Sequence, residues 1–243
     1  MADPVLVSPA GRRRGRGFAL PIPGTPGPCN AITDVPGVTV GFTTLIADGT
    51  ATVRTGVTAV LPRPAERLLE PVWAGAFSMN GNGEMTGVHW IEEAGWLTGP
   101  ITITNTFSVG LAHHATVRWM IRRFRPAFEN YLWVLPVAAE TYDGWLNDIA
   151  GQQVTEADVM AAIDGARPGP VTEGNVGGGT GMIAYEYKGG TGTASRRVTL
   201  GDDYYTVGVL VQANHGQRPW LSVCGVPVGT RLTEGRLWGE ERG

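Results

Sequence analysis

The chain has 243 residues, of which 42% are hydrophobic and 17% are charged, and these proportions are typical of a globular protein. Its formal net charge of −3 argues against nucleic acid as a main partner, because a basic surface is missing. No apolar run approaches the roughly 18 residues that a membrane-spanning helix requires, so we expect no membrane partner either.

The first 30 residues are predicted to form an extended arm, because glycine and proline interrupt every apolar run there. The basic run RRRGR at 12–16 is expected to be a solvated tail. No internal repeat and no clear linker follows, so a single domain over 1–243 is predicted, with 1–30 as its arm.

Short apolar segments separated by turns occupy the rest of the chain. Alternating or β-branched residues predict strands at 37–46, 55–61, 72–80, 101–106, 131–140, within 182–200, at 204–216 and at 220–229. Helical spacing predicts helices at 83–97, 107–124 and 155–165. Ser108 or Thr106 can cap the second helix, and Thr155 with Asp158 has the spacing of a capping box. Because several strands are apolar on both faces, two stacked sheets with helices outside are expected, which is an α/β sandwich.

Motifs that would identify a cofactor or metal are incomplete. The stretch GNVGGGTGM (174–182) lacks the Gly-Lys-Ser/Thr ending of a phosphate loop, and GTGMIA (179–184) has neither the preceding strand nor the following helix of a dinucleotide site. No serine lies in a G-x-S-x-G elbow. His113 and His114 are neighbours on a helix and point about 100° apart, so they cannot chelate one metal. We therefore expect no cofactor and no metal.

The two cysteines, Cys29 and Cys224, are far apart and form neither a disulfide framework nor a zinc-binding spacing. Small buried side chains in a reducing cytoplasm are the simplest interpretation. A cytoplasmic location is therefore expected.

Four polar residues lie at strand ends or glycine turns: Glu140, Tyr142, Lys188 and Asn214. By pattern alone each is better explained structurally, for example as a turn residue or a loop anchor. Lys188 differs in one respect, since it is the only lysine in the chain.

Five stretches together resemble a known family: PGTPGPCNAITDVPGVTVG (23–41), LPVAAETYDGWLND (135–148), EGNVGGGTGM (173–182), YKGGTGTASR (187–196) and VGVLVQANHG (207–216). They are similar to the L-aminopeptidase/D-esterases and β-peptidyl aminopeptidases, in order, from about residue 18 to residue 230. The resemblance implies a four-layer α/β/β/α sandwich and a precursor that cuts itself before a serine or threonine. Gly243 would then end the α chain, and a separate β chain would begin with the nucleophile and complete the fold. Oligomers of αβ pairs are implied as well.

The resemblance also implies roles for the four polar residues. Asn214 would donate to the oxyanion, Tyr142 would help to hold the same region, and Glu140 would receive the amino terminus of a small peptide, amide or ester substrate. Lys188 would line the site. A nucleophile that is the first residue of its chain can use its own α-amine as the base, so this chain is expected to be inert without its β chain.

Alternatives remain open at this point. The same fold suits an endo-hydrolase of unusual amides, in which Glu140 need not act, or an acyltransferase, which the five stretches resemble less. A non-catalytic oligomeric binding protein is a further hypothesis, and it predicts neither self-cleavage nor a β chain.

Overall fold

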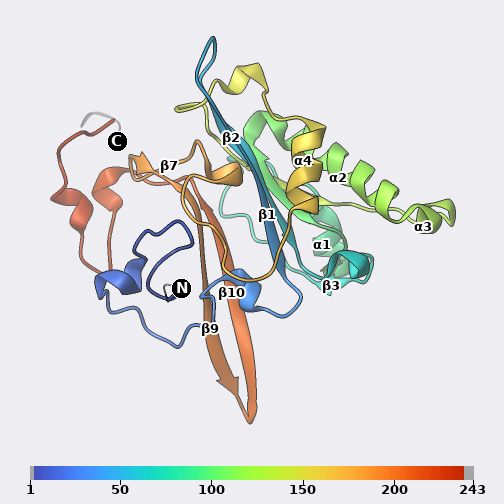
Figure 1. Ribbon diagram of the computed structural model, residues 1–243, viewed down its shortest axis with the longest axis horizontal. Helices are drawn as coiled ribbons and strands as arrows, with labels where there is room; N and C mark the ends of the chain where they lie inside the picture. Colours follow the sequence, from blue (N-terminus) through green and yellow to red (C-terminus); the bar gives the residue numbers. More distant parts are fainter. Residues whose placement is uncertain (1–2, 238–243) are drawn as a thin grey trace.

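The computed structural model describes residues 3–237, and a four-stranded sheet forms its centre (Figure 1). The strand order is β1-β2-β5-β6, and only the last pair is parallel. The strands are β1 (Thr39–Ala47), β2 (Val53–Leu61), β5 (Ile101–Asn105) and β6 (Val137–Thr141). Since β5 and β6 are parallel neighbours, their carboxyl ends meet at one edge of the sheet.

Two helices, α2 (Val109–Arg123) and α4 (Glu156–Asp164), cover one face of this sheet (Figure 1). Their apolar sides and the sheet enclose the largest core cluster, whose buried members include Val57, Leu61, Leu68, Trp119, Met120, Val159 and Ile163. Thr155 and Asp158 form the predicted capping box at the start of α4. Neither Ser108 nor Thr106 caps the other helix with its side chain. Instead Asn105 Oδ1 accepts from Ser108 N at 3.0 Å, in the 3₁₀ turn that leads into α2.

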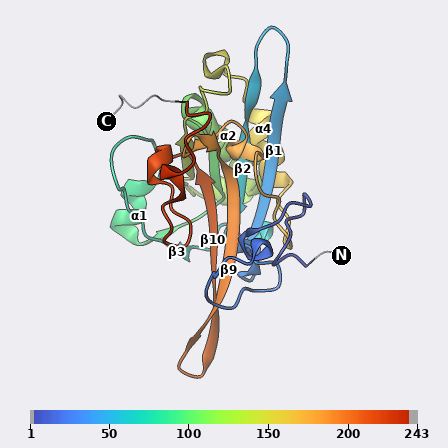
Figure 2. The same cartoon turned by 90° about the vertical axis from the view of Figure 1, so that its left-hand side faces the viewer.

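A long hairpin covers the other face of the sheet (Figures 1 and 2). It consists of β9 (Gly190–Leu200) and β10 (Asp203–Ala213), paired antiparallel from end to end. Between the sheet and the hairpin lies the 3₁₀ turn Gly177–Gly179, which is fully buried. A Cβ on Gly178 would lie 2.6 Å from the carbonyl oxygen of Ile103 and closer still to Gln212 Oε1. The glycine-rich stretch at 174–182 therefore serves close packing of two sheets.

Helices, sheet and hairpin stack as three layers, which confirms the predicted α/β sandwich. The outer face of the hairpin carries Val207, Val209 and Val211, each about half exposed. These three alternate with Gly208 and Leu210, which face the interior. A sheet face of this composition is typical of one that another layer covers.

Several predicted boundaries are wrong. The strand at 72–80 is only β3 (Val72–Trp73), which pairs with β4 (Trp96–Leu97), and the helix at 83–97 is α1 (Val88–Ala94). The strand at 131–140 starts at Val137, since α3 (Arg125–Glu129) and a loop precede it. Within 182–200, β7 (Ile183–Ala184) and β8 (Tyr187–Lys188) form a small hairpin before β9.

The predicted last strand at 220–229 does not form. Two 3₁₀ turns, Arg218–Trp220 and Val228–Thr230, flank an isolated pair between Val223 and Val226. Positive φ angles of 49° at Cys224 and 83° at the following glycine turn the chain there, and Pro227 has no amide hydrogen for a ladder.

Both cysteines are free thiols. Cys29 is partly buried, but Cys224 is exposed in the turn just described, so the expectation that both are buried is wrong for Cys224. The pKa of Cys29 is raised by burial and by the nearby Asp34 carboxylate.

The amino-terminal arm differs from a solvated tail, most clearly at Arg14. Arg14 is largely buried and binds four backbone carbonyl groups and Glu173, so the expectation of a solvated run at 12–16 is wrong for Arg14. None of the helices within residues 3–237 is long and apolar enough to cross a membrane.

Candidate active site

The polar residues at strand ends come together where the central sheet and the hairpin meet. Glu140 lies near the end of β6, Tyr142 directly follows that strand, and Asn214 directly follows β10. A hollow of about 470 Å³ opens there. Its lining residues are Asn82, Gly83, Thr106, Glu140, Thr141, Tyr142 and Asn214. The structure thus unites three of the four predicted site residues.

Two side chains of the hairpin tie its end to the end of β6. Asn214 Nδ2 donates to the carbonyl oxygen of Tyr142 at 3.0 Å, and Gln212 Nε2 donates to Thr141 Oγ1 at 2.6 Å. Since an Asn amide has two N–H groups, one donor of Asn214 stays available for a group in the hollow. The arrangement places a fixed amide donor at the junction of the two sheets.

Glu140 presents a carboxylate to the same hollow. Its Oε1 accepts from the backbone N–H of Glu84 at 2.9 Å, and its Oε2 accepts from the hydroxyl of Thr106. No lysine, arginine or histidine among residues 3–237 forms an ion pair with it. An oriented carboxylate without a cation is suited to bind an ammonium group.

Tyr142 connects this hollow with a second one of about 330 Å³. The second hollow shares Tyr142 and Asn214 with the first, and its other lining residues are Trp145, Ile183, His215, Gly216, Gln217 and Trp220. Tyr142 is 45% exposed. A substrate at the junction would therefore meet Tyr142 and Asn214 from either side.

Lys188 is placed differently from the other three. It is exposed on β8, opposite Ile183, and it lines neither hollow. The backbone of the next residue, Gly189, lies against the carbonyl of Ala213. The backbone of Lys188 is therefore close in space to the end of β10, but its side chain lines neither hollow. Of the four residues, Lys188 has the least geometric support.

Thr141 and Gln212 are contacts that the sequence patterns did not single out, and these patterns indicated Thr106 only as a helix cap. A signal for Thr106 exists, because it follows β5 directly and parallel neighbours end at the same edge. Gln212 had no such signal, because its role depends on the stacking of the hairpin against the sheet. Asn82 and Gly83 belong to the loop between β3 and α1, whose path no local pattern predicts.

Asp143 lies directly beneath this region and is fully buried. Desolvation raises the pKa of its carboxyl group, although hydrogen bonds from neighbouring side chains, including Asn147 Nδ2 at 3.1 Å, oppose the shift. The carboxyl group thus borders the site without facing either hollow.

The two histidines of α2 lie elsewhere. His114 is exposed on α2 and lies 3.7 Å from Glu156, and burial lowers the pKa of His113. Across the described part of the chain, no group of three or more His, Cys, Asp or Glu side chains could hold a metal ion.

Residues 30–238 match the family model described as peptidase family S58. The chain belongs to peptidase family S58. Its resemblance to the L-aminopeptidase/D-esterases and β-peptidyl aminopeptidases is thereby confirmed.

Two curated relatives of this S58 chain are named β-peptidyl aminopeptidase BapA. One, from Sphingosinicella microcystinivorans, is 52% identical over 236 residues, which cover 95% of this chain and 58% of the relative. The other, from Sphingosinicella xenopeptidilytica, is 50% identical over 225 residues, which cover 90% of this chain and 56% of the relative. The S58 chain therefore spans little more than half the length of these relatives.

Solved structures agree with the fold. The L-aminopeptidase D-Ala-esterase/amidase from Ochrobactrum anthropi, described as a prototype for the serine aminopeptidases and a variant of the Ntn hydrolase fold, superposes with a TM-score of 0.90 at 55% identity. That match covers 92% of this chain and 64% of the other. A β-aminopeptidase from Burkholderia sp. superposes with a TM-score of 0.85 at 52% identity, over 90% of this chain and 62% of the other. The fold is thus that of the Ntn hydrolases.

Proposed function

We propose that this chain is the α part of a self-processed N-terminal-nucleophile aminopeptidase. Such an enzyme would release small amino-terminal residues from peptides, amides or esters, with β-peptides among the candidate substrates. The single observation that carries the proposal is the Glu140 carboxylate, which faces the hollow beside Asn214 and Tyr142 with no cationic partner among the described residues. The names of the relatives point the same way.

The proposed nucleophile is a serine or threonine at the start of a separate β chain from the same precursor. The β chain would pack on the outer face of the hairpin, where Val207, Val209 and Val211 are exposed, and bring its first residue to the end of β10. Gly243, the proposed cleavage position, lies outside the described residues. We further propose that 1–243 act as one domain with 1–30 as an arm, that αβ pairs assemble into oligomers, and that the enzyme is cytoplasmic.

The proposed reaction begins when Glu140 binds the substrate ammonium group and thereby positions the first amide bond. The β-chain hydroxyl attacks the carbonyl carbon while the α-amine of the same residue takes its proton. The free N–H of Asn214 donates to the oxyanion, and the backbone around Tyr142 keeps that amide in place. The protonated amine then gives its proton to the leaving group, and water hydrolyses the acyl-enzyme.

An endo-hydrolase of unusual amides is less well supported, because a substrate without a free amine would leave Glu140 opposite no charge. A non-catalytic binding protein would not need the amide donor of Asn214 beside a carboxylate. Lys188 is proposed to line the active site only in the complete enzyme, where the β chain would turn its side chain inward.

The deciding experiment is intact-mass measurement and amino-terminal sequencing of every polypeptide that purifies with this chain from its native gene. A second polypeptide that begins with serine or threonine is expected. Hydrolysis of an aminoacyl amide and its N-acetylated counterpart by the same preparation then tests amine recognition. A lone α-sized product without hydrolysis would favour the binding protein.

A further inference from the structure

A third, strongly basic cavity lies between the amino-terminal arm and β9, away from the candidate active site. Its volume is about 280 Å³, and none of its lining residues lines either hollow described above. Five guanidinium groups but only one carboxylate line it: Arg12, Arg13, Arg14, Arg16, Arg196 and Glu173. The positive charge of the arginines that line this cavity therefore exceeds the negative charge of its one carboxylate.

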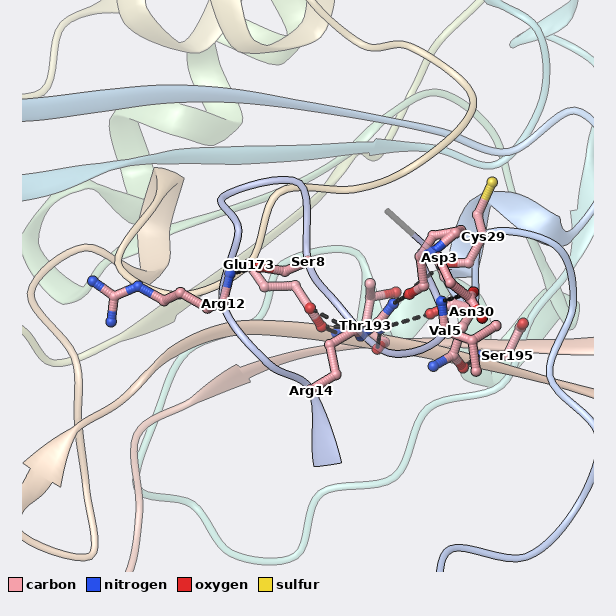
Figure 3. Close-up of polar contacts among 12 residues, drawn as sticks. Asp3, Val5, Ser8, Arg12, Arg14, Cys29, Asn30, Glu173, Thr193 and Ser195 are labelled. Carbon is pink, nitrogen blue, oxygen red and sulfur yellow. Dashed lines mark hydrogen bonds and ion pairs between the residues drawn. The ribbon is translucent and has the colours of Figure 1, made fainter. Parts of the chain in front are cut away.

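Glu173 forms an ion pair with Arg14 (Figure 3). Arg14 Nε lies 3.1 Å from Glu173 Oε2, and Arg14 Nη2 donates to Glu173 Oε1 at 3.1 Å. The same guanidinium group also donates to backbone carbonyl groups, including that of Thr193 at 2.6 Å. Arg14 is therefore a structural anchor whose charge is matched, which leaves the other four arginines without a carboxylate in the cavity.

Arg16 and Arg196 converge on one neutral atom. Arg16 Nη2 and Arg196 Nε donate to the same carbonyl oxygen, that of Pro23, at 3.0 and 2.9 Å. Two guanidinium groups at one oxygen repel each other, and burial together with the charges of Arg16 and Arg14 lowers the pKa of Arg196. In addition, Arg16 Nε is buried and has no hydrogen-bond partner among residues 3–237. An unsatisfied buried donor in a like-charge pair marks a place where an acceptor with negative charge would be stabilised.

Arg12 and Arg13 add charge at the rim of the cavity. Neither side chain forms a hydrogen bond or ion pair with any residue in 3–237, although Arg13 lies 5.9 Å from the centre of the Phe18 ring. Figure 3 shows Arg12 extended away from the contact between Arg14 and Glu173. Their charges raise the local positive potential and would attract an anion toward Arg16 and Arg196.

We propose that this cavity binds a small oxyanion with two or more negative charges, of the phosphate class, between Arg16 and Arg196. Arg16 Nε and Nη1 and Arg196 Nη2 form no hydrogen bond within residues 3–237, so these N–H groups would donate to the phosphate oxygens. Binding would also relieve the repulsion between the two side chains. The bound anion would join the arm, through Arg16, to β9, through Arg196. The anion would add to the contacts that already hold the arm on β9, among them Arg14 with Thr193 and Arg196 with Pro23.

The test is calorimetric titration of the full-length protein with inorganic phosphate at constant ionic strength, balanced with sodium chloride. Saturable binding to one site per chain is expected. Arg16→Gln and Arg196→Gln should each weaken phosphate binding at least tenfold. Arg196→Lys keeps the charge but loses the planar guanidinium group, so its affinity for phosphate should lie between those of the parent and Arg196→Gln. Arg231→Gln, a change of an exposed arginine outside the cavity, is the matched control and should bind as the parent does. Equal affinity in the parent, Arg16→Gln and Arg196→Gln would overturn the proposal, as would the absence of saturable binding.

A second measurement needs no variant and so does not depend on the folding of one. Phenylglyoxal modifies accessible guanidinium groups, and peptide mass spectrometry locates the modified arginines. Phosphate should protect Arg16 and Arg196 but not Arg231. Unchanged modification at Arg16 and Arg196 with phosphate would overturn the proposal. Complete resistance without phosphate would also overturn it, since both guanidinium groups would then be closed to small solutes.

Discussion

Asn214 Nδ2 donates to the carbonyl oxygen of Tyr142 at 3.0 Å, and this bond, together with that from Gln212 to Thr141, joins the end of the hairpin to the end of the central sheet. Asn214 and Tyr142 are 72 positions apart in sequence. The bond orients the Asn214 amide and leaves its second N–H for a ligand. The proposed oxyanion donor is therefore fixed before substrate arrives, which is the condition under which such a donor lowers a barrier.

Asn214→Ala is expected to lower kcat by about 10²–10³-fold, because a preoriented donor to the oxyanion is lost. The loss should appear mainly in kcat, with KM changed little, since the donor acts on charge that develops in the transition state. Steady-state kinetics with an aminoacyl amide measures both. A thermal unfolding curve of the variant separates a lost donor from a loosened hairpin. Unchanged turnover would remove Asn214 from the oxyanion site.

Glu140→Gln is expected to lower kcat/KM for substrates with a free amine by about 10- to 100-fold, because a charge-assisted contact becomes a neutral one. N-acetylated substrates should be affected far less. Glu84→Gln is the matched control, since it removes a nearby charge but keeps the backbone N–H of residue 84 that donates to Glu140. Equal losses on free and blocked substrates would contradict the amine-binding role.

Thr106→Val is expected to raise KM for free-amine substrates by about three- to tenfold, because Glu140 loses the hydroxyl that orients it. Thr106→Ser keeps the hydroxyl group and should restore most of the affinity. The comparison of the two variants on one substrate checks the prediction. Equal KM values for Val and Ser would mean that the hydroxyl does not orient the carboxylate.

Asp143→Asn tests the buried carboxyl group beneath the site. Since burial raises the folded-state pKa of Asp143 above the ordinary value of an aspartic acid, the folded protein holds this proton more tightly than the unfolded chain does. The stability that the protonated Asp143 carboxyl group contributes is thus fully present below its pKa in the unfolded chain. It is lost as the pH rises through its pKa in the folded protein. The difference in Tm between variant and parent should shift in favour of the variant as pH rises from about 4 toward neutrality.

Asp148→Asn is the control for that measurement, because Asp148 lies in the same loop but is exposed. Its Tm should follow that of the parent across the same pH range. If the difference in Tm between Asp143→Asn and the parent stayed constant with pH, the Asp143 carboxyl group would have the same pKa in the folded and the unfolded chain.

Gly178→Ala is expected to destabilise the protein by about 1–3 kcal/mol, because the added methyl group would overlap Gln212 and the Ile103 carbonyl between the two sheets. Gly192→Ala is the control, since a Cβ on Gly192 in β9 has no atom within 4 Å. Denaturant unfolding of both variants measures the free energies. A Gly178→Ala variant as stable as Gly192→Ala would show that the sheets can separate without cost.

The sequence by itself determined the family and the layered fold. The capping box at Thr155, the two long strands of the hairpin and the helix at 107–124 depend on neighbours in the chain, and local periodicity predicts such elements well. Glu140, Tyr142 and Asn214 were singled out by position at strand ends and by resemblance, and the fold brings them to one hollow.

Only the tertiary structure decided which local patterns persist and what surrounds the site. The apolar run at 220–229 has strand composition, but a left-handed turn at Cys224 and the lack of a partner strand within residues 3–237 prevent it from pairing. Arg14 and the arginines around it looked like a solvated run, yet the arm folds back and buries Arg14 against Glu173, 159 positions away. Thr106, Gln212 and the basic cavity depend on the stacking of distant segments. Local sequence cannot encode such contacts by itself, because their energies arise only when those segments meet.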